Sequence, residues 1–137
     1  MENQQYCTAA FLDVSQALDK VWHPGLLLKI KRILPSSYSN LLNSYLNERQ
    51  FETKFNGETS SHFYIHSGVP QGGTVGPLLY VLYTSDLATS RQTTLCTIAD
   101  DTAIFATHED SRIASLNLQE HLHIIEKWLK KWKIEVN

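Results

Sequence analysis

The sequence has little of the residues that mark several large classes of protein. Its two cysteines, Cys7 and Cys96, lie far apart, so it lacks the disulfide framework of small secreted domains. No apolar run approaches membrane-spanning length, and the leader Met1–Gln5 is polar rather than a secretory signal. We therefore expect an intracellular protein, cytoplasmic or nuclear, with reduced thiols and no membrane partner.

The sequence also has no large excess of one charge and no set of histidines and cysteines with zinc-binding spacing. The formal net charge of −2 argues against a strongly basic nucleic-acid-binding module, but it leaves room for an enzyme that uses local patches. Among the six histidines, His121 and His123 are two positions apart on a predicted helix and diverge, so no zinc-binding set emerges. The glycine-rich stretch 67–77 has neither the Gly-Lys-Ser/Thr ending of a P-loop nor a G-x-G-x-x-G spacing.

Two adjacent aspartates interrupt an apolar stretch. The runs Leu95–Ala99 and Thr102–Ala106 flank Asp100 and Asp101, which predicts a β-hairpin with both aspartates at its tip. Neighbouring carboxylates cost free energy unless something neutralises them, and Mg²⁺ prefers such oxygen ligands. Taken alone, a solvent-exposed acidic turn is the commoner explanation of such a pair.

A third aspartate ends the first predicted strand. The run Tyr6–Val14 is mostly apolar, which indicates a strand buried on both faces, and Asp13 lies near its end. If this strand pairs beside Leu95–Ala99, Asp13 comes next to Asp100. Three carboxylates at one sheet edge would suit two divalent ions that clamp the oxygens of an in-line displacement. Taken alone, Asp13 is more often a helix- or turn-capping residue.

Apolar periodicity and end signals indicate four helices. They are expected to run from His23 to Pro35, from Ser36 or Ser37 to Leu46, from Pro77 to about Leu87, and from Ser111, as the capping residue, to about Trp132. The first should place Lys29 on its solvated face, and the third should be buried nearly all round. Alternation on both sides of Asn56-Gly57 predicts a hairpin with a type I′ turn.

The order of elements predicts the fold class. A strand, two helices, a hairpin, a helix, a hairpin and a helix suit an α+β fold, with a mainly antiparallel sheet and helices packed on one face. The outline is ferredoxin-like, with the Asn-Gly hairpin as an addition. The length of 137 residues suits one domain, and the final residues alternate as a strand beginning would, which suggests a fragment of a longer protein.

Three segments, taken together, resemble the palm of a reverse transcriptase, specifically that of jockey-like non-LTR retrotransposons. Phe11–His23 (FLDVSQALDKVWH) resembles the first palm motif, and Ser67–Leu87 resembles the S-G-V-P-Q-G-x-x-x-G-P-x-L motif of that family. Ile98–Phe105 (IADDTAIF) resembles its aromatic-x-Asp-Asp motif. The similarity covers nearly the whole chain, and it implies a polymerase palm with part of the fingers. The N-terminal fingers segment and the C-terminal thumb are expected to lie outside residues 1–137.

The resemblance implies roles for individual residues. Asp13 and Asp100 would bind two Mg²⁺ ions, which Mn²⁺ could replace; Asp101 would complete the acidic cluster and the Val14 carbonyl would add a ligand. The remaining positions would bind substrate. Gln16, Ala17 and Leu18 would lie beneath the sugar of an incoming deoxynucleotide, and Gln71 and Gly72 would hold the nucleotide and its templating base.

Three positions depart from the family pattern, of which Gly73, in place of a more usual serine, is expected to be a mild change. Leu18 stands where Phe or Tyr usually excludes a ribose 2′-hydroxyl, which implies weak discrimination against ribonucleotides. Ile98 stands where an aromatic residue usually supports the primer end.

The resemblance implies an RNA-directed DNA polymerase that acts with an RNA template, a DNA primer and a deoxynucleoside triphosphate. No specific protein partner is indicated. The alternative is a catalytically silent retrotransposon remnant that acts as a binding module or has no function. A metal-dependent nuclease has no support beyond the carboxylates.

Overall fold

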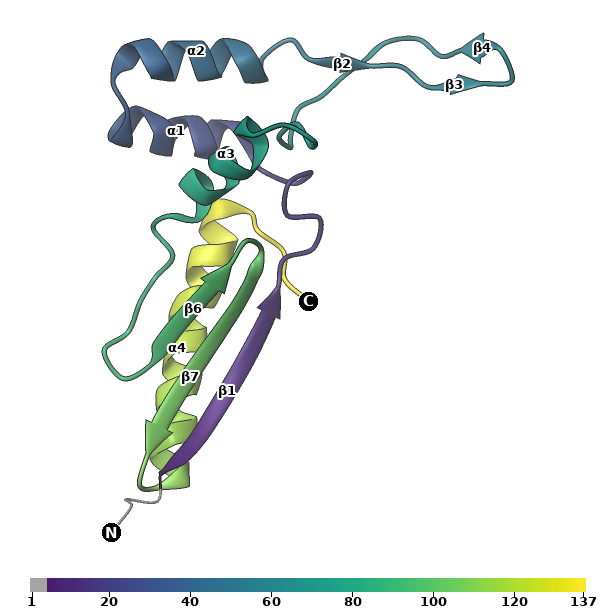
Figure 1. Ribbon diagram of the computed structural model, residues 1–137. Coiled ribbons are helices and arrows are strands. Elements are labelled where there is room, and N and C mark those ends of the chain that lie inside the picture. The colour runs from purple at the N-terminus through teal and green to yellow at the C-terminus, as the bar shows by residue number, and fades with distance from the viewer. Residues whose placement is uncertain (1–4) are drawn as a thin grey trace. The chain divides into compact units, whose positions relative to one another are not determined.

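The computed structural model describes residues 5–137, which fold as two compact units. The first unit combines both ends of the sequence, residues up to Ala17 and from Thr84 onward, and the second spans Leu18–Tyr83. The first unit holds the strands β1 (Tyr6–Asp13), β6 (Thr94–Ile98) and β7 (Asp101–His108) and the helix α4 (Ser111–Trp132). Its three strands form one antiparallel sheet in the order β1-β7-β6, with α4 against one face (Figure 1).

The core of the first unit lies between the sheet and α4. Its buried centre consists of four side chains, two from β7 and two from α4: Ile104, Ala106, Leu118 and Ile125. Ala10, Leu12 and Leu95 from the neighbouring strands pack against this centre. The other face of the sheet is open, because Phe11 is 74% exposed and Ile98 is 79% exposed.

The open face corrects one expectation about β1. Its residues alternate between half-buried and exposed along the strand, so β1 is not buried on both faces. Only one helix covers this antiparallel sheet, and small residues such as Ala9 contribute apolar character without needing a second layer. Cys7 on β1 and Cys96 on β6 are likewise free and exposed.

The helix α4 has the predicted length but a different cap. Asp110, not Ser111, is the N-cap residue, and its Oδ1 accepts a hydrogen bond of 2.8 Å from the Arg112 backbone amide. The buried His121 connects α4 to the segment before β6. Its Nε2 lies 2.9 Å from the Ala88 carbonyl oxygen and its Nδ1 2.6 Å from Thr93 Oγ1.

The second unit contains three helices and a thin β-ribbon. The helices are α1 (His23–Ile33), α2 (Ser36–Leu46) and α3 (Val75–Thr84). The ribbon pairs β2 (Gln50–Phe51) with β5 (Phe63–Tyr64) and β3 (Lys54–Phe55) with β4 (Glu58–Thr59). It extends away from the paired helices α1 and α2 (Figure 1). None of the helices described is long and apolar enough to cross a membrane.

The turn of the β3–β4 hairpin is as predicted. Asn56 and Gly57 both have positive φ, 48° and 86°, as a type I′ turn requires. The start of α3 is not, because the helix begins at Val75, two residues before Pro77. Two residues of α3, Leu78 and Val81, are each 56% exposed, so the helix is not buried all round.

Lys29 lies on the buried side of α1, contrary to the solvated position that its charge suggested. Its Nζ donates a hydrogen bond to the Tyr83 carbonyl oxygen and lies 5.2 Å from the Tyr83 ring centroid. A buried ammonium needs such partners, and the carbonyl and the ring face provide them. Burial raises the pKa of the Tyr83 hydroxyl to about 12, although a hydrogen bond with the Trp22 backbone opposes the rise.

Candidate metal and nucleotide site

The acidic hairpin turns one residue earlier than the sequence pattern suggested. Ile98 pairs with Asp101 across the hairpin, so Ala99 and Asp100 form the turn and Asp101 is the first residue of β7. Ala99 has a φ of 55°, a left-handed conformation that usually favours glycine or asparagine. The chain therefore holds an alanine in a strained conformation directly beside two aspartates.

The sheet order decides which aspartate lies beside Asp13. The central strand is β7, so β1 does not pair with β6, and Asp13 is directly opposite Asp101. Residues paired in this way have Cα atoms about 4.5–5.5 Å apart and side chains on the same face. The expected neighbour, Asp100, belongs to the adjoining turn instead.

Two facing carboxylates form an electrostatically unfavourable pair. None of the ion pairs found among residues 5–137 joins Asp13, Asp100 or Asp101 to a basic side chain. Within the same range, no three His, Cys, Asp or Glu side chains are grouped closely enough to hold a metal ion. Mg²⁺ often binds proteins through one or two carboxylates and otherwise keeps water and substrate phosphates. The Asp13–Asp101 pair fits that mode of binding.

A cavity of about 410 Å³ lies beside this pair on the open face of the sheet. Its lining combines the two carboxylates with apolar side chains of all three strands: Phe11, Leu12, Asp13, Cys96, Ile98, Asp101, Thr102, Ala103 and Asn137. Ile98 thus lies beside the acidic pair.

The last residues of the chain fasten the end of β1. Val14 and Val136 form an antiparallel bridge, and the Asn137 amide donates a hydrogen bond of 2.9 Å to the Asp13 carbonyl oxygen. The Asn137 side-chain nitrogen lies 3.5 Å from Asp13 Oδ2. Sequence reasoning missed Asn137; the alternating pattern of the final residues was its only signal.

Three further candidates follow Asp13 in the first unit. Val14 is half-buried. The two backbone hydrogen bonds of the Val14–Val136 bridge run from the Ser15 amide to the Glu135 carbonyl oxygen (3.1 Å) and from the Asn137 amide to the Asp13 carbonyl oxygen (2.9 Å), so neither uses the Val14 carbonyl. Gln16 is exposed and has a φ of 53°, again unusual for a residue with a side chain. Ala17, which follows, is half-buried.

The other candidates belong to the second unit, where two segments are joined closely. The Val69 amide donates a hydrogen bond of 2.7 Å to the Leu18 carbonyl oxygen, and the Gly68 amide donates one of 2.9 Å to Val21. The buried His23 places its Nε2 2.7 Å from the Gly68 carbonyl oxygen. Gly68 has a φ of 85°, and a Cβ there would lie 2.6 Å from the Asp19 carbonyl oxygen, so this close approach requires glycine.

Beyond that junction the loop is exposed. Gln71 and Gly72 are both exposed, and Gly72 has a φ of 82°. The Gln71 Nε2 donates a hydrogen bond of 2.7 Å to Asp19 Oδ1. Sequence reasoning missed Asp19, although a carboxylate directly after Leu18 in the first motif was a signal.

Comparison with known proteins identifies the family. The profile of "Reverse transcriptase (RNA-dependent DNA polymerase)" matches residues 1–137. The chain belongs to the reverse transcriptase family. Its relatives include the "RNA-directed DNA polymerase from mobile element jockey" of Drosophila melanogaster, 40% identical over 145 aligned residues that cover 100% of this chain.

Two more relatives in this family are the probable RNA-directed DNA polymerases from transposon BS and transposon X-element of the same organism. They are 38% and 37% identical, and each alignment covers 99% of this chain. The chain spans about 16% of the length of each of these three reverse transcriptases.

Proposed function

We propose that this chain is the palm of an RNA-directed DNA polymerase of a mobile element, in which a ferredoxin-like sheet presents the metal-binding carboxylates. The observation that carries the proposal is the cross-strand pairing of Asp13 with Asp101 beside the turn that contains Asp100. Asp13 and Asp101 are far apart in sequence, but they lie directly opposite each other on the open face of the sheet.

The proposed reaction transfers a nucleotidyl group from a deoxynucleoside triphosphate to a primer 3′-hydroxyl. The facing pair of Asp13 and Asp101 would hold one Mg²⁺ ion, and Asp100 and the Val14 carbonyl would add ligands for a second ion when it binds. Mn²⁺ could take the place of both ions. Bound ions of this kind lower the pKa of an attacking hydroxyl and neutralise charge on the phosphates. The protein's own contribution is to fix the carboxylates on a supported hairpin and to align the reacting groups.

The exposed loop and the segment after Asp13 supply the proposed substrate contacts. Leu18, with Gln16 and Ala17, would lie beneath the sugar of the nucleotide, and Gln71 and Gly72 would contact the nucleotide and the templating base. The junction of Leu18 with Val69 supports the part of this assignment that lies in the second unit, because it joins Leu18 to the segment that leads to Gln71 and Gly72. An RNA template and a DNA primer are the proposed partners.

Primer extension on an RNA template tests this function. With Mg²⁺ or Mn²⁺ we expect extension by the unaltered chain and a loss of about 100-fold or more in Asp13→Asn and Asp100→Asn, since each removes charge at the reacting phosphates. Glu109→Gln, which removes an exposed carboxylate at the far end of β7, is the matched control and should keep full activity. Equal extension by the Asp13 variant would contradict the site. No extension by any form would favour the alternative, a catalytically silent remnant.

A further inference from the structure

Asp19, in the second unit, has a carboxylate to which the proposed function gives no role. Asp19 Oδ1 accepts a hydrogen bond of 2.7 Å from Gln71 Nε2. Both residues are exposed, so neither side chain is held in place by burial. We propose that Asp19 is a positioning residue that orients the Gln71 amide for the nucleotide, an inference that rests on the proposed function.

The backbone of Asp19 is held from several sides. Its neighbour Leu18 accepts a 2.7 Å hydrogen bond from the Val69 amide, and its own carbonyl oxygen lies against Gly68 so closely that no side chain fits there. Ser67 Oγ donates a longer hydrogen bond, 3.4 Å, to the same Asp19 carbonyl oxygen. The carboxylate therefore projects from a fixed part of the chain, whereas Gln71 projects from the exposed loop beyond the junction.

The chemistry of the two groups fixes which end of the amide faces Asp19. An ionised carboxylate only accepts hydrogen bonds, so the Gln71 NH₂ group must face it, and the charge-assisted bond is stronger than a neutral one. The Gln71 carbonyl oxygen Oε1 is then left as the acceptor for a ligand. A hydrogen-bond donor, such as a hydroxyl or amino group of the nucleotide, is what this orientation selects.

Pre-ordering the side chain also favours binding. A free glutamine has several rotatable bonds, and fixing it upon binding costs free energy that a pre-oriented glutamine has already lost. We therefore expect removal of the Asp19 carboxylate to weaken nucleotide binding about two- to tenfold, the range that corresponds to ordering one flexible side chain. Steady-state kinetics should register the change in KM for the nucleotide more than in kcat.

The direct test is nuclear magnetic resonance of the Gln71 side-chain amide in the full chain, with the signal assigned by its loss in Gln71→Ala. In Asp19→Asn, which keeps the size but not the charge, we expect the amide protons to shift and to exchange faster with water. Glu58→Gln is the matched control, because it removes an exposed carboxylate of the same unit on the β3–β4 hairpin and leaves the Asp19–Gln71 contact in place. An amide signal unchanged by Asp19→Asn would overturn the inference.

Titration with dTTP and Mg²⁺ tests the consequence for the substrate. Asp19→Asn should weaken dTTP binding two- to tenfold. Asp19→Glu should restore part of the affinity because it is again only an acceptor, and the control Glu58→Gln should leave dTTP binding unchanged. In a Gln71→Ala background, Asp19→Asn should have no further effect. An equal loss in that background would overturn the inference, because Asp19 would then act independently of Gln71.

The same titration separates two failures. If the unaltered chain binds dTTP and the Asp19 variants bind it equally well, only the role of Asp19 is contradicted. If the unaltered chain binds no dTTP, the proposed function is contradicted, and the substrate-orienting half of this inference is contradicted with it.

Discussion

The β3–β4 and β6–β7 hairpins both close with a two-residue turn, Asn56-Gly57 in one and Ala99-Asp100 in the other. In the first, both turn residues have positive φ and are of the types that tolerate it. In the second, Ala99 adopts a φ of 55° although alanine resists it. One turn follows local preference, and the other opposes it beside the proposed metal site.

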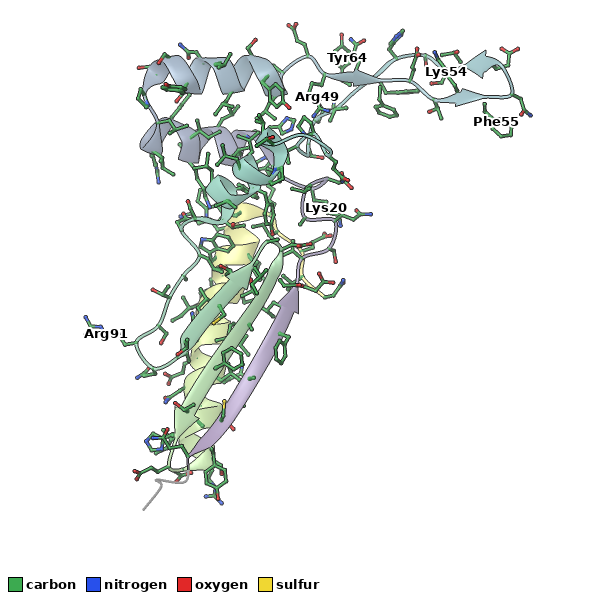
Figure 2. The ribbon with its side chains drawn as sticks, viewed as in Figure 1. Lys20, Arg49, Lys54, Phe55, Tyr64 and Arg91 are labelled. Atoms are coloured by element: carbon green, nitrogen blue, oxygen red, sulfur yellow. The ribbon has the colours of Figure 1, made fainter. Side chains whose placement is uncertain are left out.

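The hairpin with the unfavourable turn is the better packed of the two. The β6–β7 hairpin lies against α4 through Ile104, which is fully buried. The β3–β4 ribbon has no buried residue, and Phe55 at its end is 76% exposed (Figure 2). A turn with unfavourable local geometry is thus found where tertiary packing supports it, and a turn with favourable geometry where support is slight.

The largest expected effect comes from removing that support. Ile104→Ala leaves a cavity beneath the β6–β7 hairpin and should lower the free energy of unfolding by about 2–5 kcal/mol. The matched change on the other hairpin, Phe55→Ala, removes an exposed ring and should alter stability by less than about 0.5 kcal/mol. Urea unfolding followed by tryptophan fluorescence measures both, since Trp128 and Trp132 lie on α4 in the first unit and Trp22 lies in the second. Similar losses in the two variants would contradict the contrast in packing.

Exchanging alanine and glycine in the two turns should change the stability of the two hairpins in opposite directions. Ala99→Gly relieves the left-handed conformation and should stabilise the first unit by up to about 1 kcal/mol, because glycine adopts positive φ without steric cost. Gly57→Ala places a Cβ on a residue with a φ of 86° and should destabilise its ribbon by about 1–2 kcal/mol. Hydrogen exchange of the strand amides reports each hairpin separately. Destabilisation by Ala99→Gly would mean that Ala99 is not strained.

The smallest expected effect concerns the facing carboxylates. Asp101→Asn removes repulsion with Asp13 and should stabilise the metal-free chain by about 0.2–1 kcal/mol. Added Mg²⁺ should raise the melting temperature of the unaltered chain and have less effect on the variant, since binding to the folded state stabilises it. Thermal unfolding with and without Mg²⁺ measures both, with Glu109→Gln as the control. Equal Mg²⁺ responses in all three proteins would argue against a metal site at this pair.

Local patterns in the sequence predicted the elements well. Helical periodicity located α1, α2 and α4, and Asn56-Gly57 located a turn, because these signals depend on neighbours along the chain. The position of the acidic turn was wrong by one residue. Cross-strand pairing, here Ile98 with Asp101, sets that register, and no single residue encodes it.

Contacts between segments that are distant in sequence could not be predicted from local sequence patterns. The pairing of Asp13 with Asp101 depends on β7 being the central strand, which is a property of the whole sheet. Lys29 seemed solvated because its burial depends on Tyr83, far along the chain. Asp19 and Asn137 were missed for the same reason, since each is recognised only by the side chain that it meets in space.

The pairing of β1 with β7 also has a consequence for how the chain folds. During synthesis β1 emerges before its partner β7, which begins at Asp101, after the entire second unit has been made. Closing so long a loop is entropically costly, so this pairing should form late and slowly. The second unit has time to fold before the carboxylates of Asp13 and Asp101 meet. Within residues 5–137, the proposed metal site would therefore be among the last parts to assemble.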